Sequence, residues 1–134
     1  MANFYGTART NYFKVKDAEA FKAWVEDLPS VVLIEKDGLF GFYSDCPDSG
    51  TFPSSRWDDE KEDFVEIDLT AELAEFLTDD TIAVLMEAGA EKKRYISAWA
   101  QAVNHKGEVE TISLFDIYGM AEERFGIKPT PAEY

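Results

Sequence analysis

An Asp37-Gly38 pair separates two apolar runs in the segment VVLIEKDGLFGFYSD, which begins at Val31. Asp and Gly tolerate the positive φ angles of a tight two-residue turn, so the pair predicts two antiparallel strands joined directly. The first run, up to Ile34, is continuously apolar, which is typical of a strand covered on both faces. This hairpin constrains the fold strongly, because it favours an antiparallel sheet over a parallel one.

Other segments repeat the strand pattern. The alternation of apolar and polar side chains predicts a strand from Arg9 to Val15, and FVEIDL, from Phe64, alternates in the same way. Three later strands are predicted at TIAVLME, KRYISAWAQAV and EVETISL, with AGAEK and NHKG supplying the two turns between them.

Three helices are predicted between these strands. Asp17 is placed to cap the first and Pro29 to end it, Thr70 to cap the second, and Gly126 to close the third. Ser113 and Asp116 have capping-box spacing at the start of the third helix. The apolar stripes expected to be buried are Phe21, Trp24, Val25 and Leu28, then Leu69, Leu73, Phe76 and Leu77, then Leu114, Ile117, Tyr118, Ala121 and Phe125.

These elements predict an α+β fold in the order β-α-β-β-loop-β-α-β-β-β-α. We expect a mostly antiparallel sheet of about six or seven strands, with about three helices on one side. Residues 1–134 suit a single domain. Residues 44–63 are expected to form a long acidic and aromatic loop, and residues 127–134 a short frayed tail. A loop of that length is usually functional or mobile.

The net charge of −14 narrows the possible partners. Such a charge repels nucleic acids and anionic membrane surfaces, and it attracts basic proteins. The one basic cluster, Lys92 to Arg94, lies in or beside a predicted turn. We therefore expect no direct nucleic-acid binding and no membrane association. The same charge also keeps a protein soluble without any further role, and this alternative stays open.

Few residues indicate catalysis or metal binding. Cys46 is the only cysteine, which excludes an internal disulfide, and His105 is the only histidine, in a predicted turn. The acidic loops do not follow a calcium-binding pattern. We therefore expect a protein that is not an enzyme and holds no metal or cofactor. No signal-peptide core or membrane span is apparent in the sequence, so we also expect a cytoplasmic protein. A small carboxylate-dependent enzyme is a less favoured alternative.

The most unusual stretch runs from Trp57 to Asp80, where Lys61 is the only basic residue. Amphipathic patterning alone explains its outer helix and strand positions, which are expected to face water: Glu66, Asp68, Glu72 and Glu75. It does not explain WDDEKED, because a predicted loop has no inner face that requires an outer one. Aromatic residues ringed by charge are typical of protein interfaces. The predicted partner-binding residues are Trp57, Asp58, Asp59, Glu60, Glu62, Asp63, Glu66, Asp68, Glu72, Glu75, Asp79 and Asp80.

Two segments carry a resemblance to known proteins. YGTARTNYFKVKD, near the start, and AVLMEAGAEKKRYISAWAQAVNHKGEVETISLFDIYGMAEERFG, near the end, resemble small acidic orphan proteins of phages and plasmids. Small acidic proteins of phages and plasmids include anti-CRISPR and antirestriction inhibitors. The resemblance implies a role in blocking host defence, and it assigns no residue a role.

The favoured hypothesis is a non-enzymatic protein that binds a basic surface of a host protein. A CRISPR-Cas or restriction subunit is the expected target, with the carboxylates imitating the phosphates of a nucleic acid. A soluble accessory protein and an immunity protein or antitoxin are the alternatives. The chain itself is expected to be a monomer or a homodimer.

Overall fold

The computed structural model describes residues 4–47, 49–91 and 95–132, and the side chains from residue 5 onward within them. The Lys92–Arg94 cluster therefore lies outside the described residues. The elements, in chain order, are β1 (Phe4–Thr10), α1 (Ala18–Asp27), β2 (Val31–Lys36), β3 (Leu39–Ser44), β4 (Ser55–Asp58), β5 (Asp63–Glu66), α2 (Leu69–Ala74), β6 (Ala83–Glu91), β7 (Tyr95–Val103), β8 (Val109–Ser113) and α3 (Asp116–Phe125).

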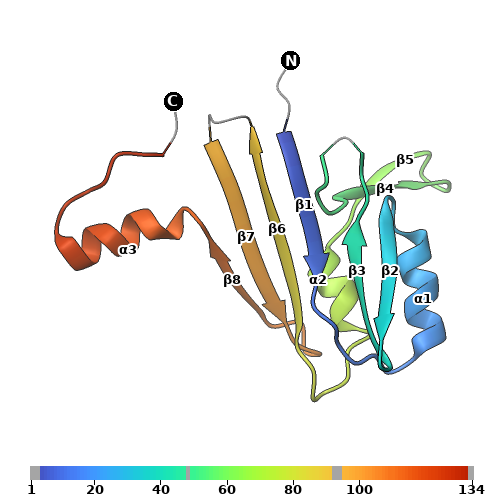
Figure 1. Ribbon diagram of the computed structural model, residues 1–134. Coiled ribbons are helices and arrows are strands. Elements are labelled where there is room, and N and C mark those ends of the chain that lie inside the picture. The colour runs from blue at the N-terminus through green and yellow to red at the C-terminus, as the bar shows by residue number, and fades with distance from the viewer. Residues whose placement is uncertain (1–3, 48, 92–94, 133–134) are drawn as a thin grey trace.

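Six strands form one antiparallel sheet in the order β2-β3-β1-β6-β7-β8, and β4 pairs with β5 in a separate hairpin (Figure 1). The predicted fold class and element order are confirmed. Helices α1 and α2 cover one face of the sheet, while α3 projects beyond the edge strand β8 (Figure 1). The other face, here called the open face, presents apolar side chains that include Met86, Ala88, Ala98, Ala100, Ile112 and Leu114.

The core lies between the sheet and the helices α1 and α2, and it contains a cluster of aromatic rings. Phe21 of α1 is completely buried at its centre. Its ring centroid lies 5.6–5.8 Å from those of four other rings, in tilted or edge-to-face arrangements that aromatic pairs prefer. The four rings belong to Phe13, Trp24, Phe40 and Phe76.

Local sequence signals set several boundaries as predicted. Asp37 and Gly38 adopt φ angles of 53° and 80° and join β2 to β3. The Asp17 carboxylate accepts a hydrogen bond from the Ala20 backbone N–H at 3.1 Å and caps α1. Gly126 closes α3 in the left-handed conformation. These signals act over a few residues, so tertiary packing does not override them.

The first strand differs from its prediction, because β1 spans Phe4–Thr10 and only isolated bridges continue toward Val15. The hydroxyl of Thr10 is buried, donates to the Asn11 carbonyl oxygen and accepts from the Phe42 backbone N–H. This hydroxyl connects the end of β1 to β3, while Thr10 stays paired with Leu85 of β6 on the other side. Beyond it, Phe13 exchanges backbone hydrogen bonds with Phe40.

Two local predictions in the acidic region are wrong. The segment 44–63, predicted to be a loop, contains strand β4, because Ser55–Asp58 pairs with β5. Asp68, not Thr70, caps α2, and its carboxylate accepts from the Ala71 backbone N–H at 3.3 Å. The helix begins at Leu69, so the residue before it, Asp68, is the N-cap.

The expected burial of α3 is also wrong, since none of its ten residues is buried. Ile117, Met120 and Phe125 are 57%, 61% and 67% exposed, because α3 leaves the sheet edge and meets no second apolar layer. The predicted capping box is wrong as well, because Phe115 rather than Ser113 is the N-cap of α3 and no side chain caps the helix. The Ser113 backbone N–H donates to the Asp116 carboxylate at 2.8 Å instead. The helices in the described part of the chain are each too short, or insufficiently apolar, to cross a membrane.

Candidate protein-interaction surface

The hairpin β4–β5 presents an aromatic pair to solvent. Trp57 and Phe64 lie directly opposite each other on the two strands, and their rings meet edge to face with centroids 5.4 Å apart. Trp57 is 52% exposed and Phe64 is 65% exposed. An aromatic pair of this kind stabilises a hairpin by about 0.5–1.5 kcal/mol and leaves a large apolar surface available to a partner.

Carboxylates surround this aromatic pair. Asp58 and Asp63 face each other in the strand register, and Glu60 and Glu62 occupy the turn between them. Like charges placed directly opposite each other destabilise a strand pair. Glu62 also adopts a φ of 51°, which is unfavourable for a residue with a Cβ. The hairpin thus keeps a concentration of negative charge although the Asp58–Asp63 pairing and the Glu62 backbone conformation both lower its stability.

Three carboxylates of the hairpin, those of Asp58, Asp59 and Asp63, accept hydrogen bonds within it. The Asp63 carboxylate accepts from the Phe64 backbone N–H at 2.8 Å. The Asp58 carboxylate accepts from the backbone N–H groups of Glu60 at 2.9 Å and Lys61 at 3.2 Å, so it holds the turn. The Asp59 carboxylate accepts from the indole N–H of Trp57 at 2.8 Å, and this bond orients the ring. Glu60, Glu62 and Glu66 are exposed and point their charge to solvent.

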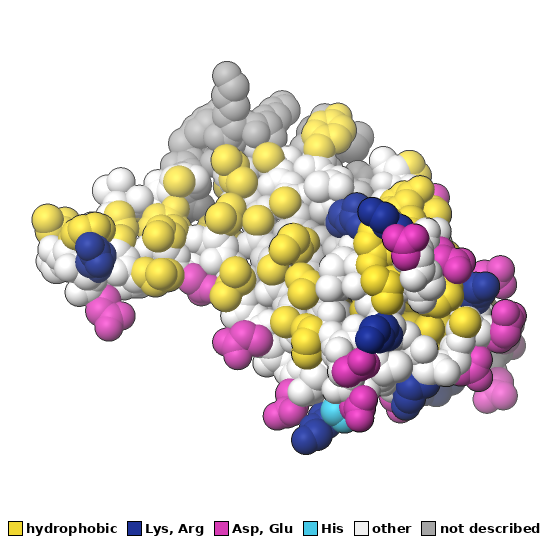
Figure 2. Space-filling model, turned by 60° about the horizontal axis from the view of Figure 1, so that its bottom comes forward, with side chains coloured by type: hydrophobic (Ala, Val, Ile, Leu, Met, Phe, Trp, Pro, Cys, Tyr) yellow, Lys and Arg dark blue, Asp and Glu magenta, His cyan; other side chains and the backbone are white. Residues whose placement is uncertain are grey.

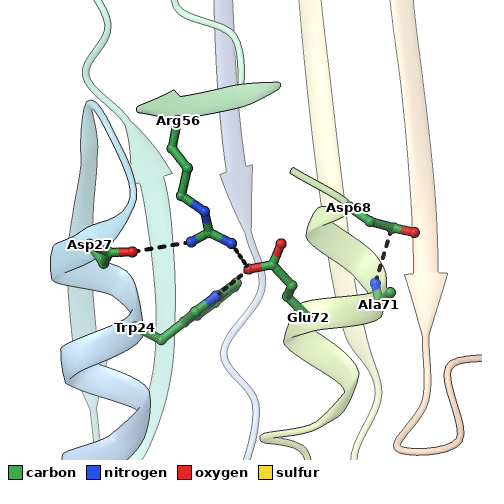
Figure 3. A network of polar contacts seen from close by, with 6 residues as sticks. All are labelled: Trp24, Asp27, Arg56, Asp68, Ala71 and Glu72. Carbon is green, nitrogen blue, oxygen red and sulfur yellow. Dashed lines mark hydrogen bonds and ion pairs between the residues drawn. The ribbon is translucent and has the colours of Figure 1, made fainter. Parts of the chain in front are cut away.

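Arg56 attaches the hairpin to the body of the protein (Figure 3). Its guanidinium pairs with Glu72 of α2 and, at 3.2 Å, with Asp27 at the end of α1. Trp24 of α1 donates its indole N–H to the same Glu72 carboxylate at 3.0 Å. The hydrogen bond to Glu72 raises the pKa of Arg56, and partial burial acts in the opposite direction. One half-buried carboxylate therefore links β4, α1 and α2.

This network corrects the sequence interpretation of Glu72, which was expected to face water. Its side chain is only 26% exposed because Arg56 and Trp24 both bind it. Asp68, likewise assigned to a partner, instead caps α2. Glu66 and Glu75 remain exposed, as their alternating and helical positions predict.

Asp79 and Asp80 lie apart from the hairpin. They belong to the loop that enters β6, at the opposite end of the sheet (Figure 1). Asp80 pairs with Lys14 at 2.8 Å and accepts from the Thr78 hydroxyl at 2.7 Å. The sequence stretch from Trp57 to Asp80 therefore does not form one continuous acidic surface. Trp57, the five carboxylates from Asp58 to Asp63 and Glu66 are the members that the hairpin β4–β5 brings together.

The Asp80–Lys14 pair predicts a specific pH dependence. The hydrogen bond from Lys14 lowers the pKa of Asp80 below its usual 3.8, and the same bond raises the pKa of Lys14 above 10.5. The stabilisation by Asp80 is therefore complete above pH 3.8 and is lost as the pH falls through the lowered pKa. An NMR titration of the Asp80 carboxyl carbon measures this pKa. Lys14→Met is expected to raise it toward 3.8, whereas Lys16→Met leaves it unchanged; a wild-type Asp80 pKa of 3.8 or higher contradicts the prediction.

Sequence reasoning missed Phe64 as a member of this surface. The signal was present in FVEIDL, because alternation places Phe64 on the same side of the strand as Glu66, opposite Val65 and Ile67. Ile67 is buried and Val65 is partly buried, as that alternation requires. What the sequence did not reveal was the pairing of Ser55–Asp58, which brings Trp57 against Phe64.

Two further side chains with acid–base groups, Glu87 and His105, lie outside the hairpin. The partly buried Glu87 accepts hydrogen bonds from the Phe52 backbone N–H at 2.9 Å and from the Trp99 indole N–H at 2.8 Å. His105 is exposed in the turn before β8. Among the described residues, no group of three or more His, Cys, Asp and Glu side chains is arranged to hold a metal ion.

Comparison with known proteins returns no family, since no protein-family model, curated protein or solved structure matches this chain.

Proposed function

We propose that this chain is a non-enzymatic binding protein that docks hairpin β4–β5 onto a basic protein surface. The observation that carries the proposal is the exposed Trp57–Phe64 pair with the carboxylates of residues 58–63 around it. An aromatic centre with a charged rim is how many interfaces combine affinity with specificity. Dense negative charge also speeds the encounter with a basic partner.

The partner class that best fits this charge is the basic groove of a nucleic-acid-handling protein. Carboxylates there occupy the sites that phosphates otherwise use, so binding excludes DNA or RNA. A mobile-element inhibitor of a CRISPR-Cas or restriction complex is the form of this function that we propose. An immunity protein or antitoxin that neutralises a basic toxin would use the same surface and differs only in its target.

The decisive variant reverses the charge of Glu60, Glu62 and Glu66 to lysine. This choice spares Asp58 and Asp59, whose carboxylates hold the turn and the Trp57 ring. Tagged wild-type chain is expected to capture a basic nucleic-acid-binding protein from a bacterial lysate at low salt and to release it at high salt. Purified partner should then bind the variant at least about 100-fold more weakly, because attraction becomes repulsion.

A matched control places the same charge change elsewhere. Glu26, Glu35 and Asp79 are exposed and lie outside the hairpin, so their triple lysine variant has the same net charge as the test variant. It is expected to keep most of the affinity. Equal weakening by both triple variants would show a general charge effect, and unchanged binding by the hairpin variant would exclude the hairpin as the site. Competition of the purified partner with duplex DNA then tests nucleic-acid mimicry.

A further inference from the structure

Apart from the aromatic pair of the hairpin, two further apolar surfaces in the described part of the chain face solvent. The first is the open face of the sheet, which is hollowed into a trough of about 330 Å³ across β1, β6, β7 and β8. Small side chains, including Ala88, Ala98 and Ala100, form its floor, and the larger Met86 and Ile112 border it. Met86 is 56% exposed and Ile112 is 63% exposed. A sheet face of this composition is normally covered by a helix or a second sheet.

The second surface is helix α3. Ile117, Met120 and Ala121 lie along one side of it, with Phe125 one turn further on. Its acidic residues Asp116, Glu122 and Glu123 are on the remaining circumference. Figure 2 shows hydrophobic side chains over the sheet and along the projecting helix, with most acidic side chains toward the margins. The same chain thus has a sheet face that no helix covers and a helix, α3, whose apolar side packs on no sheet.

The connection between β8 and α3 prevents α3 from covering its own trough. Only Leu114 and Phe115 separate the two elements, and both are held in place. The Leu114 backbone N–H donates to the Ala98 carbonyl oxygen at 2.9 Å, and its own carbonyl accepts from Ile117 at 3.2 Å. Phe115 already has helical φ and ψ angles. A connection this short directs the helix away from its sheet, a geometry that favours exchange between two copies.

We propose that a second copy of this chain covers the open face, with each α3 docked in the trough of the other copy. The exchange is reciprocal, so it closes as a symmetric dimer. Large apolar side chains on both surfaces are more than half exposed, namely Met86, Ile112, Ile117, Met120 and Phe125. Mutual coverage buries both sets in both copies, and a stable interface of standard size buries about 1,600 Å² in total.

Charge is compatible with this arrangement. Arg9 borders the trough and is exposed, so it is available to the carboxylates of an incoming α3. The two copies repel each other through their net charge of −14 each, and salt screens that repulsion. Dimerisation is therefore expected to strengthen or stay constant as salt rises. Binding of a basic partner by the hairpin has the opposite salt dependence, so each proposal can fail without the other.

The test is the molar mass of the full chain in solution, measured by sedimentation equilibrium over a range of concentration. We expect a dimer for the wild type. Ile117→Glu is expected to raise the dimer dissociation constant at least about 30-fold, as truncation of an interface hot spot does. Gly119→Glu is the matched control. It adds the same charge about 200° around the same helix, where an added Cβ meets no atom within 4 Å.

A mixing experiment tests the exchange itself. Ala88→Arg blocks the trough from an exposed position, and Ile117→Glu blocks the helix, so each variant alone is expected to be monomeric. Mixed together they retain one intact trough and one intact α3, which restores a heterodimer. Restoration supports exchange, whereas two variants that stay monomeric when mixed overturn it.

Three further outcomes would also overturn the proposal. The first is a wild-type monomer at every concentration. The second is a dimer that Ile117→Glu weakens no more than Gly119→Glu does. The third is a wild-type monomer whose trough binds a small apolar dye that Ala88→Arg excludes, because the occupant is then a ligand. Circular dichroism must show a native fold for each variant, which is expected because all three substituted positions are exposed.

Discussion

Phe21→Ala is expected to lower the free energy of unfolding by about 4 kcal/mol, the middle of the range for truncating a buried phenylalanine. Phe21 is fully buried and contacts rings from β3, α1, the segment after β1 and the segment after α2. Loss of its ring leaves a cavity that these four rings cannot all move to fill, since each is held by a different element. Chemical denaturation followed by far-UV circular dichroism measures the change.

Phe64→Ala is the matched control for this prediction. It removes the same ring at a position that is 65% exposed, where the contact with Trp57 is the main loss. About 1 kcal/mol is expected there. Equal effects of the two substitutions would contradict the placement of Phe21 at the centre of the core. Phe64→Ala is also expected to weaken partner binding, which Phe21→Ala does only through unfolding.

The burial of Phe21 was predicted from the sequence, and it shows which structural features a sequence can predict. Its stripe with Trp24, Val25 and Leu28 lies between a capping aspartate and a proline, and all three signals act within about ten residues. The Asp37-Gly38 turn is equally local. Such signals decide the element order and most of the core, because they depend on backbone geometry and helical or strand periodicity rather than on distant partners.

The acidic residues show which features the sequence did not predict. Glu72 has the helical position of a solvent-facing residue, yet Trp24, 48 residues earlier in the chain, binds its carboxylate. Asp79 and Asp80 follow the hairpin closely in sequence but lie at the other end of the sheet. Whether a carboxylate is a structural ligand or part of a free surface depends on long-range contacts, and periodicity does not contain that information.

The exposure of α3 was not predicted for a related reason. Its apolar stripe correctly predicted a helix, but periodicity indicates only that one side needs a partner. Whether that partner is the same chain or another depends on the length and direction of the connection. Here Leu114 and Phe115 are too few and too constrained to return α3 over its own sheet.

Arg56→Ala is expected to release the hairpin from α1 and α2 and to lower the free energy of unfolding by about 2 kcal/mol. The guanidinium is 24% exposed and bonds both Asp27 and Glu72. Its removal leaves the half-buried Glu72 carboxylate with Trp24 as its remaining partner among these residues, and an undercompensated charge is costly. Arg56→Lys is expected to restore only part of the loss, because one ammonium does not reproduce a guanidinium that spans two carboxylates.

Hydrogen exchange at the backbone amides of β4 and β5 is the most direct measurement of this release. Arg56→Ala should accelerate exchange in the hairpin more than in β6 or β7, since the central strands keep their pairing. Lys61→Ala is the control, because it removes a cation from the turn of the same hairpin without touching the network. Uniform acceleration throughout the sheet would show that Arg56 supports the whole fold. Acceleration confined to the hairpin, with weaker partner binding, would show that the network of Arg56, Glu72 and Trp24 holds the acidic surface in the orientation that binding requires.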